Sequence, residues 1–114
     1  MLRRGGLHWA EMDKRRAVLI LSPESRNDLA SDLIVVPCST VLRGGPWHVQ
    51  LARGEGGLAR RSVVLCEQIT TLVKRRVDLD TLGPPLSMSR MAEVERAVLL
   101  AIGILEPTTR AQLT

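Results

Sequence analysis

Apolar and polar positions along this 114-residue chain follow two different periods. Through the first two-thirds, apolar residues gather in short runs or alternate with polar residues, which is typical of β-strands. We therefore expect about five to seven short strands joined by turns. The segments that carry the pattern are 7–12, 17–21, 32–39, 47–51, 62–69 and 77–82.

Two of these segments alternate clearly enough to predict which side chains share a face. In residues 47–51 the apolar positions lie on one face, so His48, on the opposite face, is expected at the surface. In residues 77–82, Val77 and Leu79 share one face and oppose two aspartates.

The segments between the strands are rich in turn-forming residues. Residues 22–31 contain proline, asparagine and aspartate, and residues 43–46 (RGGP) form a tight-turn signal. Residues 52–61 combine glycines with arginines, which predicts a mobile, charged loop.

Near the end of the chain the period changes to that of a helix. Apolar residues recur at three- and four-residue steps, which predicts one helix over about residues 88–105. Ser87, or alternatively Ser89, is the expected N-cap, and Pro107 follows the last turn. Residues 106–114 are expected to form a flexible tail. The helix carries more apolar surface than one face needs, and a dimer interface would bury the excess.

Length and hydrophobicity indicate one small domain, residues 1–114, with a modest core, since 45% of the residues are hydrophobic. Short strands followed by one helix predict a mainly β fold with a C-terminal α-helix, arranged as an SH3-like small barrel. The N-terminal residues do not resemble a signal peptide, and the longest apolar run, 97–105, is too short to cross a bilayer. We therefore expect a cytoplasmic protein without membrane contact.

Positive charge is the feature of the composition that bears on function. The net charge is +4, and all but two of the 16 lysines and arginines are arginines. Arginine suits the two-pronged recognition of phosphate, so an anionic partner such as nucleic acid is favoured, although a GC-rich genome explains the arginines equally well. Trp9 and Trp47 are the only aromatic residues, which excludes a sheet-wide platform for stacking bases.

The two cysteines, Cys38 and Cys66, lie far apart in apolar segments and lack the spacing of metal ligands. We expect buried thiols, with a disulfide or a catalytic cysteine as the alternatives. No histidine cluster and no glycine-rich phosphate loop predicts a metal or a cofactor, so neither is expected.

Polar residues at the ends of three predicted strands are the candidates for chemistry. They are Arg15 and Arg16 before strand 17–21, Ser39 and Thr40 after strand 32–39, and Glu67 and Gln68 at the end of strand 62–69. If these residues project into one cleft, the cations and hydroxyls would hold a phosphodiester and stabilise the charge that builds during RNA cleavage. Each also has a plainer interpretation as a solvated strand end, a turn residue or a surface residue.

The order of the segments resembles that of the MazF/PemK family of toxin endoribonucleases. The matching blocks are MLRRGGLHWAEM, RRAVLILSPESRN, DLIVVPCSTVLRGGPWHVQL and SVVLCEQITTL, and the resemblance extends through the terminal helix. It implies a homodimer that cuts single-stranded RNA at short sequence motifs without metal, leaving 2′,3′-cyclic phosphate and 5′-OH ends. It also implies a cognate antitoxin whose acidic, partly disordered segment blocks the cleft.

By position, the resemblance places the family's catalytic arginine on Arg16 and its phosphate-binding hydroxyl on Ser39, with Thr40 as a neighbouring substitute. The family's acidic residue and glutamine fall on Glu67 and Gln68, as structural or RNA-contacting residues. Basic loops extend the expected RNA track, and Trp47 either stacks on an unpaired base or belongs to the core. The remaining predicted RNA contacts are Lys14, Arg15, Arg43, Arg60 and Arg61.

Three departures from the family pattern bear on activity. The loop before Arg16 shrinks to EMDK, which leaves Glu11 and Asp13 as the nearest counterparts of the family's acidic residue there. Ala17 replaces a proline, and Thr70 stands where the family carries a later arginine. The alternatives to an active endoribonuclease are a catalytically weak member and a non-enzymatic toxin that binds gyrase. The ending RAQLT lacks the Trp-Gly-Ile of such gyrase poisons.

Overall fold

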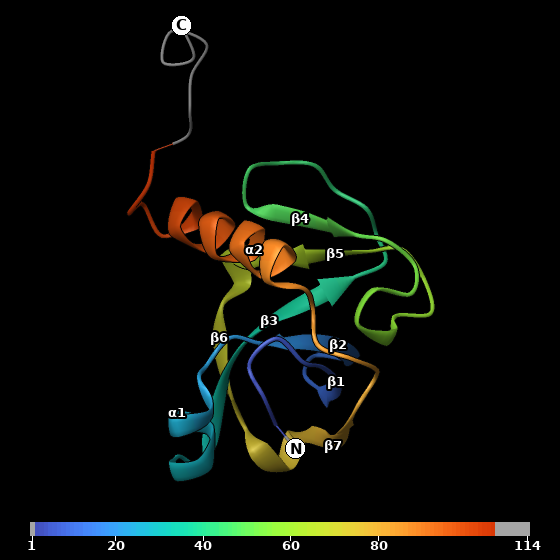
Figure 1. Cartoon of the computed structure of the whole chain (residues 1–114), viewed down its shortest axis with the longest axis vertical. Coiled ribbons are helices and arrows are strands. Elements are labelled where there is room, and N and C mark those ends of the chain that lie inside the picture. Colours follow the sequence, from blue (N-terminus) through green and yellow to red (C-terminus); the bar gives the residue numbers. More distant parts are fainter. Residues whose placement is uncertain (1, 107–114) are drawn as a thin grey trace, which may run out of the picture.

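The computed structural model describes residues 2–106 of the chain. Within this range, seven strands and two α-helices are joined by loops and short 3-10 turns, and α2 lies across one end of the sheet (Figure 1). The strands are β1 (Leu7–Glu11), β2 (Arg15–Ile20), β3 (Asp32–Ser39), β4 (His48–Leu51), β5 (Ser62–Leu65), β6 (Thr70–Val73) and β7 (Val77–Thr81). The α-helices are α1 (Glu24–Leu29) and α2 (Met88–Ala101), and the 3-10 turns are η1 (Glu55–Gly57), η2 (Cys66–Gln68) and η3 (Lys74–Arg76).

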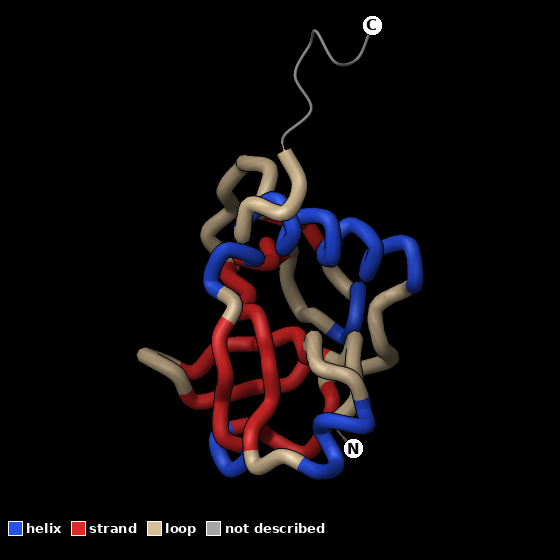
Figure 2. The backbone as a smooth tube through the Cα atoms, turned by 90° about the vertical axis from the view of Figure 1, so that its left-hand side faces the viewer, coloured by secondary structure: helices blue, strands red, loops and turns tan. Residues whose placement is uncertain are grey.

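Strand β3 is the centre of the sheet. It pairs with β2 along one edge, and along the other edge with β6 near its start and β5 near its end. The strand order is β4-β5-β3-β2-β1-β7, with β6 paired to β3 off this path, so β4, β6 and β7 are outer strands. The curved sheet stays open (Figure 2). The prediction of a mainly β fold with a C-terminal helix is therefore confirmed, whereas the small barrel is not closed.

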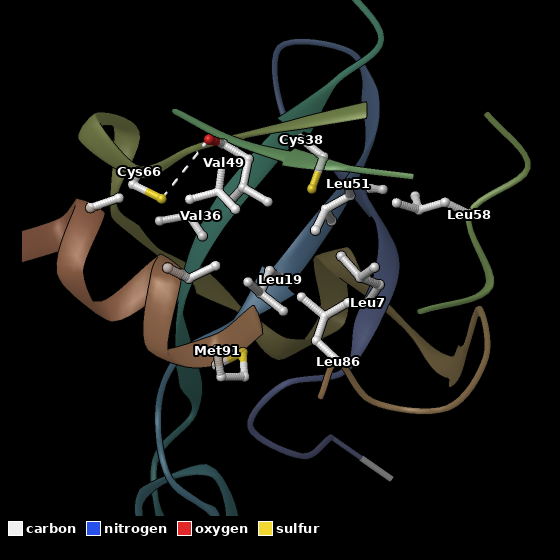
Figure 3. Packing of buried hydrophobic residues seen from close by; sticks show 14 residues of the cluster. Leu7, Leu19, Val36, Cys38, Val49, Leu51, Leu58, Cys66, Leu86 and Met91 are labelled. Atoms are coloured by element: carbon white, nitrogen blue, oxygen red, sulfur yellow. Dashed lines mark hydrogen bonds between the residues drawn. The ribbon is translucent and has the colours of Figure 1, made fainter. Parts of the chain in front are cut away.

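The two central strands are buried on both faces, which explains their continuous apolar runs. Leu19 and Val36 belong to a cluster that α2 covers, while Val18 and Val35 belong to a second cluster formed by the alternate residues of the same strands. Figure 3 shows the first cluster, into which Met91 projects from α2. The helix is thus held to the sheet by its apolar stripe.

Both cysteines lie in this first cluster as free thiols. Cys38 enters it from β3 and Cys66 from η2 (Figure 3). Burial raises the pKa of each thiol to about 12, so both stay protonated, and poorly nucleophilic, at neutral pH. The prediction of buried thiols is confirmed, and the disulfide alternative is wrong.

Helix α2 begins at the predicted N-cap, since the Arg90 N–H donates to Ser87 Oγ at 3.1 Å. It ends at Ala101 rather than at residue 105. Gly103 adopts a φ of +82°, and its N–H turns back to the carbonyl of Leu100, which closes the last turn. The apolar period continues past this point, so periodicity alone placed the end of the helix too late.

Other elements also differ from the prediction. Segment 62–69 is not one strand, because η2 turns the chain after β5 and leads into β6, which the sequence analysis missed. Residues 22–31, predicted as turns, contain α1. Leu79 is 69% exposed although Val77 on the same predicted face is buried, since β7 is an outer strand. The predicted tail falls outside the described residues, apart from Glu106.

Candidate active site

A cleft of about 720 Å³ lies where the ends of β1, β2 and β3 meet β7 and the loop that follows β4. It gathers cations and hydroxyl groups from segments far apart in the chain, and such a lining suits a phosphate-bearing ligand. The basic and hydroxyl-bearing residues that line it are Lys14, Arg15, Arg16, Arg60, Ser39, Thr40, Ser62 and Thr81. Six of the residues predicted from the sequence to act on RNA are therefore brought together: Lys14, Arg15, Arg16, Ser39, Thr40 and Arg60.

Strand pairing explains why Arg16 and Ser39 meet. β2 pairs with β3 up to Val18 opposite Pro37, and the same register carried on by two residues places Arg16 opposite Ser39. Ser39 Oγ accepts a hydrogen bond from the Val41 N–H at 3.0 Å, which leaves its own O–H free to donate to a ligand. The cleft thus contains both a guanidinium and a hydroxyl group, from neighbouring strands.

Asp13 orients the Arg16 side chain. Arg16 Nε and Nη2 donate to the two carboxylate oxygens of Asp13 at 3.1 and 3.2 Å. These hydrogen bonds hold the pKa of Asp13 below its ordinary value. The Asp13 side chain is 69% exposed, so water weakens the pair, and the remaining Arg16 N–H groups are available to an incoming anion.

Arg15 has different partners from Arg16. Its guanidinium donates to Glu11 at 2.9 Å and also to Asp78 on β7, and these carboxylates, Asp78 first, raise the pKa of Arg15. The same guanidinium lies 5.8 Å from the centroid of the Trp9 ring. Arg15 thus joins β1 to β7 within the cleft, whereas Arg16 lines the cleft with a single acidic partner, Asp13.

The segment predicted as a mobile loop forms one wall of the cleft and is anchored at several points. Glu55 accepts hydrogen bonds from Arg90 of α2 at 2.7 and 2.9 Å, and Arg90 lowers the pKa of that carboxyl. Leu58 is buried in the main cluster. Gly57 has a φ of +87° and packs so closely on Leu82 that a Cβ would lie 2.1 Å from its carbonyl oxygen.

Several residues predicted to contact RNA lie outside the lining of this cleft. Trp47 is 38% exposed on the loop before β4, so its interpretation as a core residue is wrong. The His48 side chain is only 8% exposed, which contradicts the surface prediction, because its ring contacts Glu67 at 2.6 Å and the Gly44 carbonyl at 2.9 Å. The predicted RNA contacts that do not line the cleft are Arg43, Trp47, Arg61, Glu67 and Gln68.

The cleft also contains residues that the sequence analysis did not predict as site residues, among them Trp9, Asp78 and Asp80. Trp9 shares the outward face of β1 with Glu11, while the intervening Ala10 is buried. The sequence did contain one signal for Trp9, because it shares a face of an alternating strand with the charged residue Glu11. Asp78 and Asp80 alternate along β7, but nothing local shows that β7 borders the cleft.

The described part of the chain contains neither a cluster of metal ligands nor a membrane-spanning helix. Among residues 2–106, no three His, Cys, Asp or Glu side chains come together in a way that would hold a metal ion. No helix in the same range is long and apolar enough to cross a bilayer.

The open β-sheet, its covering helix and the basic cleft define a small β domain suited to a phosphate-bearing ligand. Over residues 7–102 the sequence matches the family described as PemK-like, MazF-like toxin of type II toxin-antitoxin system. The chain therefore belongs to this toxin family, as the order of its sequence blocks predicted.

Individual relatives agree with this assignment. The chain is 29% identical to the Endoribonuclease MazF of Staphylococcus epidermidis, over 91% of this chain and 93% of that protein. The Mycobacterium tuberculosis toxin MazF-mt6 superposes with a TM-score of 0.78 at 28% identity, covering 86% of this chain and 96% of that one. A mycobacterial endoribonuclease in complex with its cognate antitoxin reaches a TM-score of 0.82 at 25% identity, covering 94% and 100%.

Proposed function

We propose that this toxin is a sequence-specific endoribonuclease that cleaves single-stranded RNA without a metal ion or cofactor. The observation that carries the proposal is the cleft in which Arg16 and Ser39 come together among further cations. The similarity to a protein named Endoribonuclease MazF supports it.

In the proposed reaction, the RNA 2′-oxygen attacks the adjacent phosphorus and the bond to the 5′-oxygen breaks. The 2′-OH loses its proton, the 5′-oxygen gains one, and the products carry a 2′,3′-cyclic phosphate and a 5′-OH. Arg16 stabilises the charge on the non-bridging oxygens and is the candidate acid for the leaving oxygen. Ser39, with Thr40 beside it, donates to the same phosphate and orients it. DNA, which lacks the 2′-OH, is not cleaved.

Asp13 has a positioning role in this proposal. Its lowered pKa makes its carboxylate a weak base at neutral pH, whereas its two hydrogen bonds hold Arg16 in one orientation. Lys14, Arg15 and Arg60 line the cleft and attract the RNA backbone. The predicted contacts outside the cleft, such as Arg43 and Glu67, would meet only nucleotides that flank the bound segment.

Cleavage of single-stranded RNA in excess EDTA tests the proposal directly. We expect cuts with cyclic-phosphate and 5′-OH ends, no cutting of DNA of the same sequence, and loss of cutting in Arg16→Ala. Arg96→Ala on α2 removes the same charge outside the cleft and is the matched control. Cutting that needs a divalent metal, or that survives Arg16→Ala, would contradict the mechanism. Absence of cutting at every protein concentration would overturn the proposal and favour the alternatives of an inactive family member or a non-enzymatic toxin.

We further propose that the protein acts in the cytoplasm as a homodimer that a cognate antitoxin inhibits through an acidic, partly disordered segment. Solved relatives in complex with an antitoxin support such a partner. Ile102 and Ile104, which follow α2, are 53% and 68% exposed and offer apolar surface to a second copy. Light scattering of the purified protein tests the dimer. Co-purification with the product of a neighbouring small acidic reading frame tests the antitoxin.

A further inference from the structure

Trp9 is an exposed aromatic ring in a cleft lined largely by charges and hydroxyl groups. The residue is 43% exposed, although its neighbours His8 and Ala10 in β1 are fully buried. Proteins that bind single-stranded RNA hold unpaired bases by stacking them on such rings, and each stacked base contributes about 5- to 150-fold to affinity. The position of Trp9 is therefore unusual for a core residue and suited to a base.

The ring is held in place before any ligand binds. The Arg15 guanidinium lies 5.8 Å from the ring centroid. Arg15 is itself fixed by hydrogen bonds to Glu11 and Asp78, which come from β1 and β7. A ring ordered in this way loses little conformational freedom on binding, so more of the stacking energy appears as affinity.

Trp9 also lies close to the proposed reaction centre. In the β1–β2 hairpin Trp9 pairs with Ala17, and Arg16, in the adjacent pair, projects from the opposite face of the hairpin near the start of β2. Both side chains line the same cleft. A phosphodiester bound at Arg16 therefore brings the base of a flanking nucleotide within reach of the ring.

Asp80 lines the same cleft as the Trp9 ring and would favour a base that carries an amino group. It lines the cleft with Asp78, but Asp78 is occupied by Arg15, whereas Asp80 has no ion pair or hydrogen bond within residues 2–106. A carboxylate repels phosphate, yet it accepts a hydrogen bond from an exocyclic amino group such as that of cytosine. Uracil carries a carbonyl oxygen where cytosine carries its amino group, so it cannot donate this hydrogen bond.

We propose that Trp9 stacks on a base beside the cleaved phosphodiester and that Asp80 accepts a hydrogen bond from the amino group of that base. The cleft then prefers cytosine or adenine to uracil at this position. The inference rests on the proposed function, because it assigns a base subsite to the same cleft.

The two tryptophans provide a matched pair for the first experiment. Trp47→Phe leaves Trp9 as the only fluorophore, and Trp9→Phe leaves Trp47, which is outside the cleft. Each variant is titrated with 2′-O-methyl oligocytidylate, which cannot be cleaved because its 2′-oxygen is blocked. We expect saturable quenching in Trp47→Phe and none in Trp9→Phe. Quenching confined to Trp47, or none in either variant, overturns the stacking role.

Affinity provides the second readout, by competition with a labelled oligonucleotide. Trp9→Ala is expected to bind about 5- to 150-fold more weakly and Trp9→Phe to retain part of the affinity, because a smaller ring still stacks. Unfolding curves of both variants show whether the fold is kept. Equal binding by folded Trp9→Ala contradicts the inference. Quenching of Trp9 by an acidic peptide but not by RNA also contradicts it, since the ring then serves a protein partner.

Base preference tests Asp80. Oligocytidylate and oligouridylate carry the same charge, so their affinity ratio reports on the base alone. We expect the wild type to prefer cytidylate by about fivefold or more, and Asp80→Asn to lose or reverse the preference because its amide donates to the uracil oxygen. An unchanged ratio overturns the role of Asp80. If the protein cleaves RNA but the fluorescence of Trp9 does not change, the base subsite is contradicted and the proposed function stands. If RNA quenches Trp9 but is not cleaved, only the proposed catalysis is contradicted.

Discussion

Two arginines, each bound to a carboxylate through two hydrogen bonds, differ in what surrounds them. Arg16, whose side chain lines the cleft and is 19% exposed, contacts Asp13 at 3.1 and 3.2 Å, and the Asp13 side chain is 69% exposed. Arg90 contacts Glu55 at 2.7 and 2.9 Å, both side chains are about a quarter exposed, and Arg90 also binds Glu93. Arg16 therefore has one exposed carboxylate partner, whereas Arg90 has two carboxylate partners, one of them shielded.

The difference teaches that the number and exposure of the acidic partners, rather than the exposure of the arginine itself, separate a candidate catalytic cation from a structural one. The pair at the cleft is weakened by water, so an incoming phosphate can compete for Arg16. The pair on α2 is shielded and holds the loop after β4 against the helix, which makes it an anchor for the cleft wall. Breaking each pair should therefore affect different properties of the protein.

The largest effect is expected from Arg16→Ala. Loss of one group that stabilises the transition state lowers cleavage by about 10²- to 10³-fold, while the free energy of unfolding changes by about 0.5 kcal/mol or less, because its partner Asp13 is exposed to solvent. Cleavage rates and urea unfolding measure the two quantities. Arg90→Ala should instead lower the free energy of unfolding more, and the cleavage rate less, than Arg16→Ala does. If Arg90→Ala slows cleavage as much as Arg16→Ala without loss of stability, the distinction between the two pairs fails.

Gly57→Ala tests the close contact in the anchored wall. The left-handed φ and the approach to the Leu82 carbonyl leave no space for a methyl group, so we expect a loss of about 2–4 kcal/mol in unfolding free energy. Gly44→Ala is the matched control, because a Cβ there meets nothing within 4 Å. Chemical denaturation distinguishes the two variants, and equal stability would show that the wall relaxes without strain.

Glu55→Gln removes the charge of the anchor and keeps its shape. We expect a loss of about 1 kcal/mol at neutral pH. Because the folded pKa of Glu55 is lowered from 4.5, its contribution is present above that pH and is lost as the pH falls through the folded pKa. Stability curves between neutral and acid pH should therefore be flatter in Glu55→Gln than in the wild type. Asp13→Asn, in the exposed pair, should alter them little, and matching curves for both variants would contradict the comparison.

The smallest effect is expected from Lys14→Ala. Loss of one phosphate contact in the cleft should weaken RNA binding a few-fold and reduce the slope of log affinity against log salt by about 1. Arg26→Ala is the control, because Arg26 pairs with Asp32 beside α1 and does not line the cleft. Binding of a 2′-O-methyl oligonucleotide at several salt concentrations measures the slope. An equal change in both variants would indicate attraction by net charge alone.

Local patterns predicted part of the fold and part of the site. The apolar runs of β2 and β3, the burial of Val49 and Leu51 in β4 and the cap at Ser87 each depend on neighbouring residues, and the structure confirms them. The break between β5 and β6 and the end of α2 at Gly103 were missed, because turns within apolar segments depend on backbone hydrogen bonds that periodicity does not report.

The sequence by itself determined the fold class, the toxin family and the candidacy of Arg16 and Ser39, because strand alternation, helix capping and the order of the blocks are read along the chain. Only the tertiary structure decided which neighbours these two residues have. Trp9 and Asp80 join the cleft through the pairing of β1 with β2 and β7, while Glu67 turns to His48 instead. Strand register and loop anchoring bring together residues distant in the chain, and no local pattern encodes those contacts.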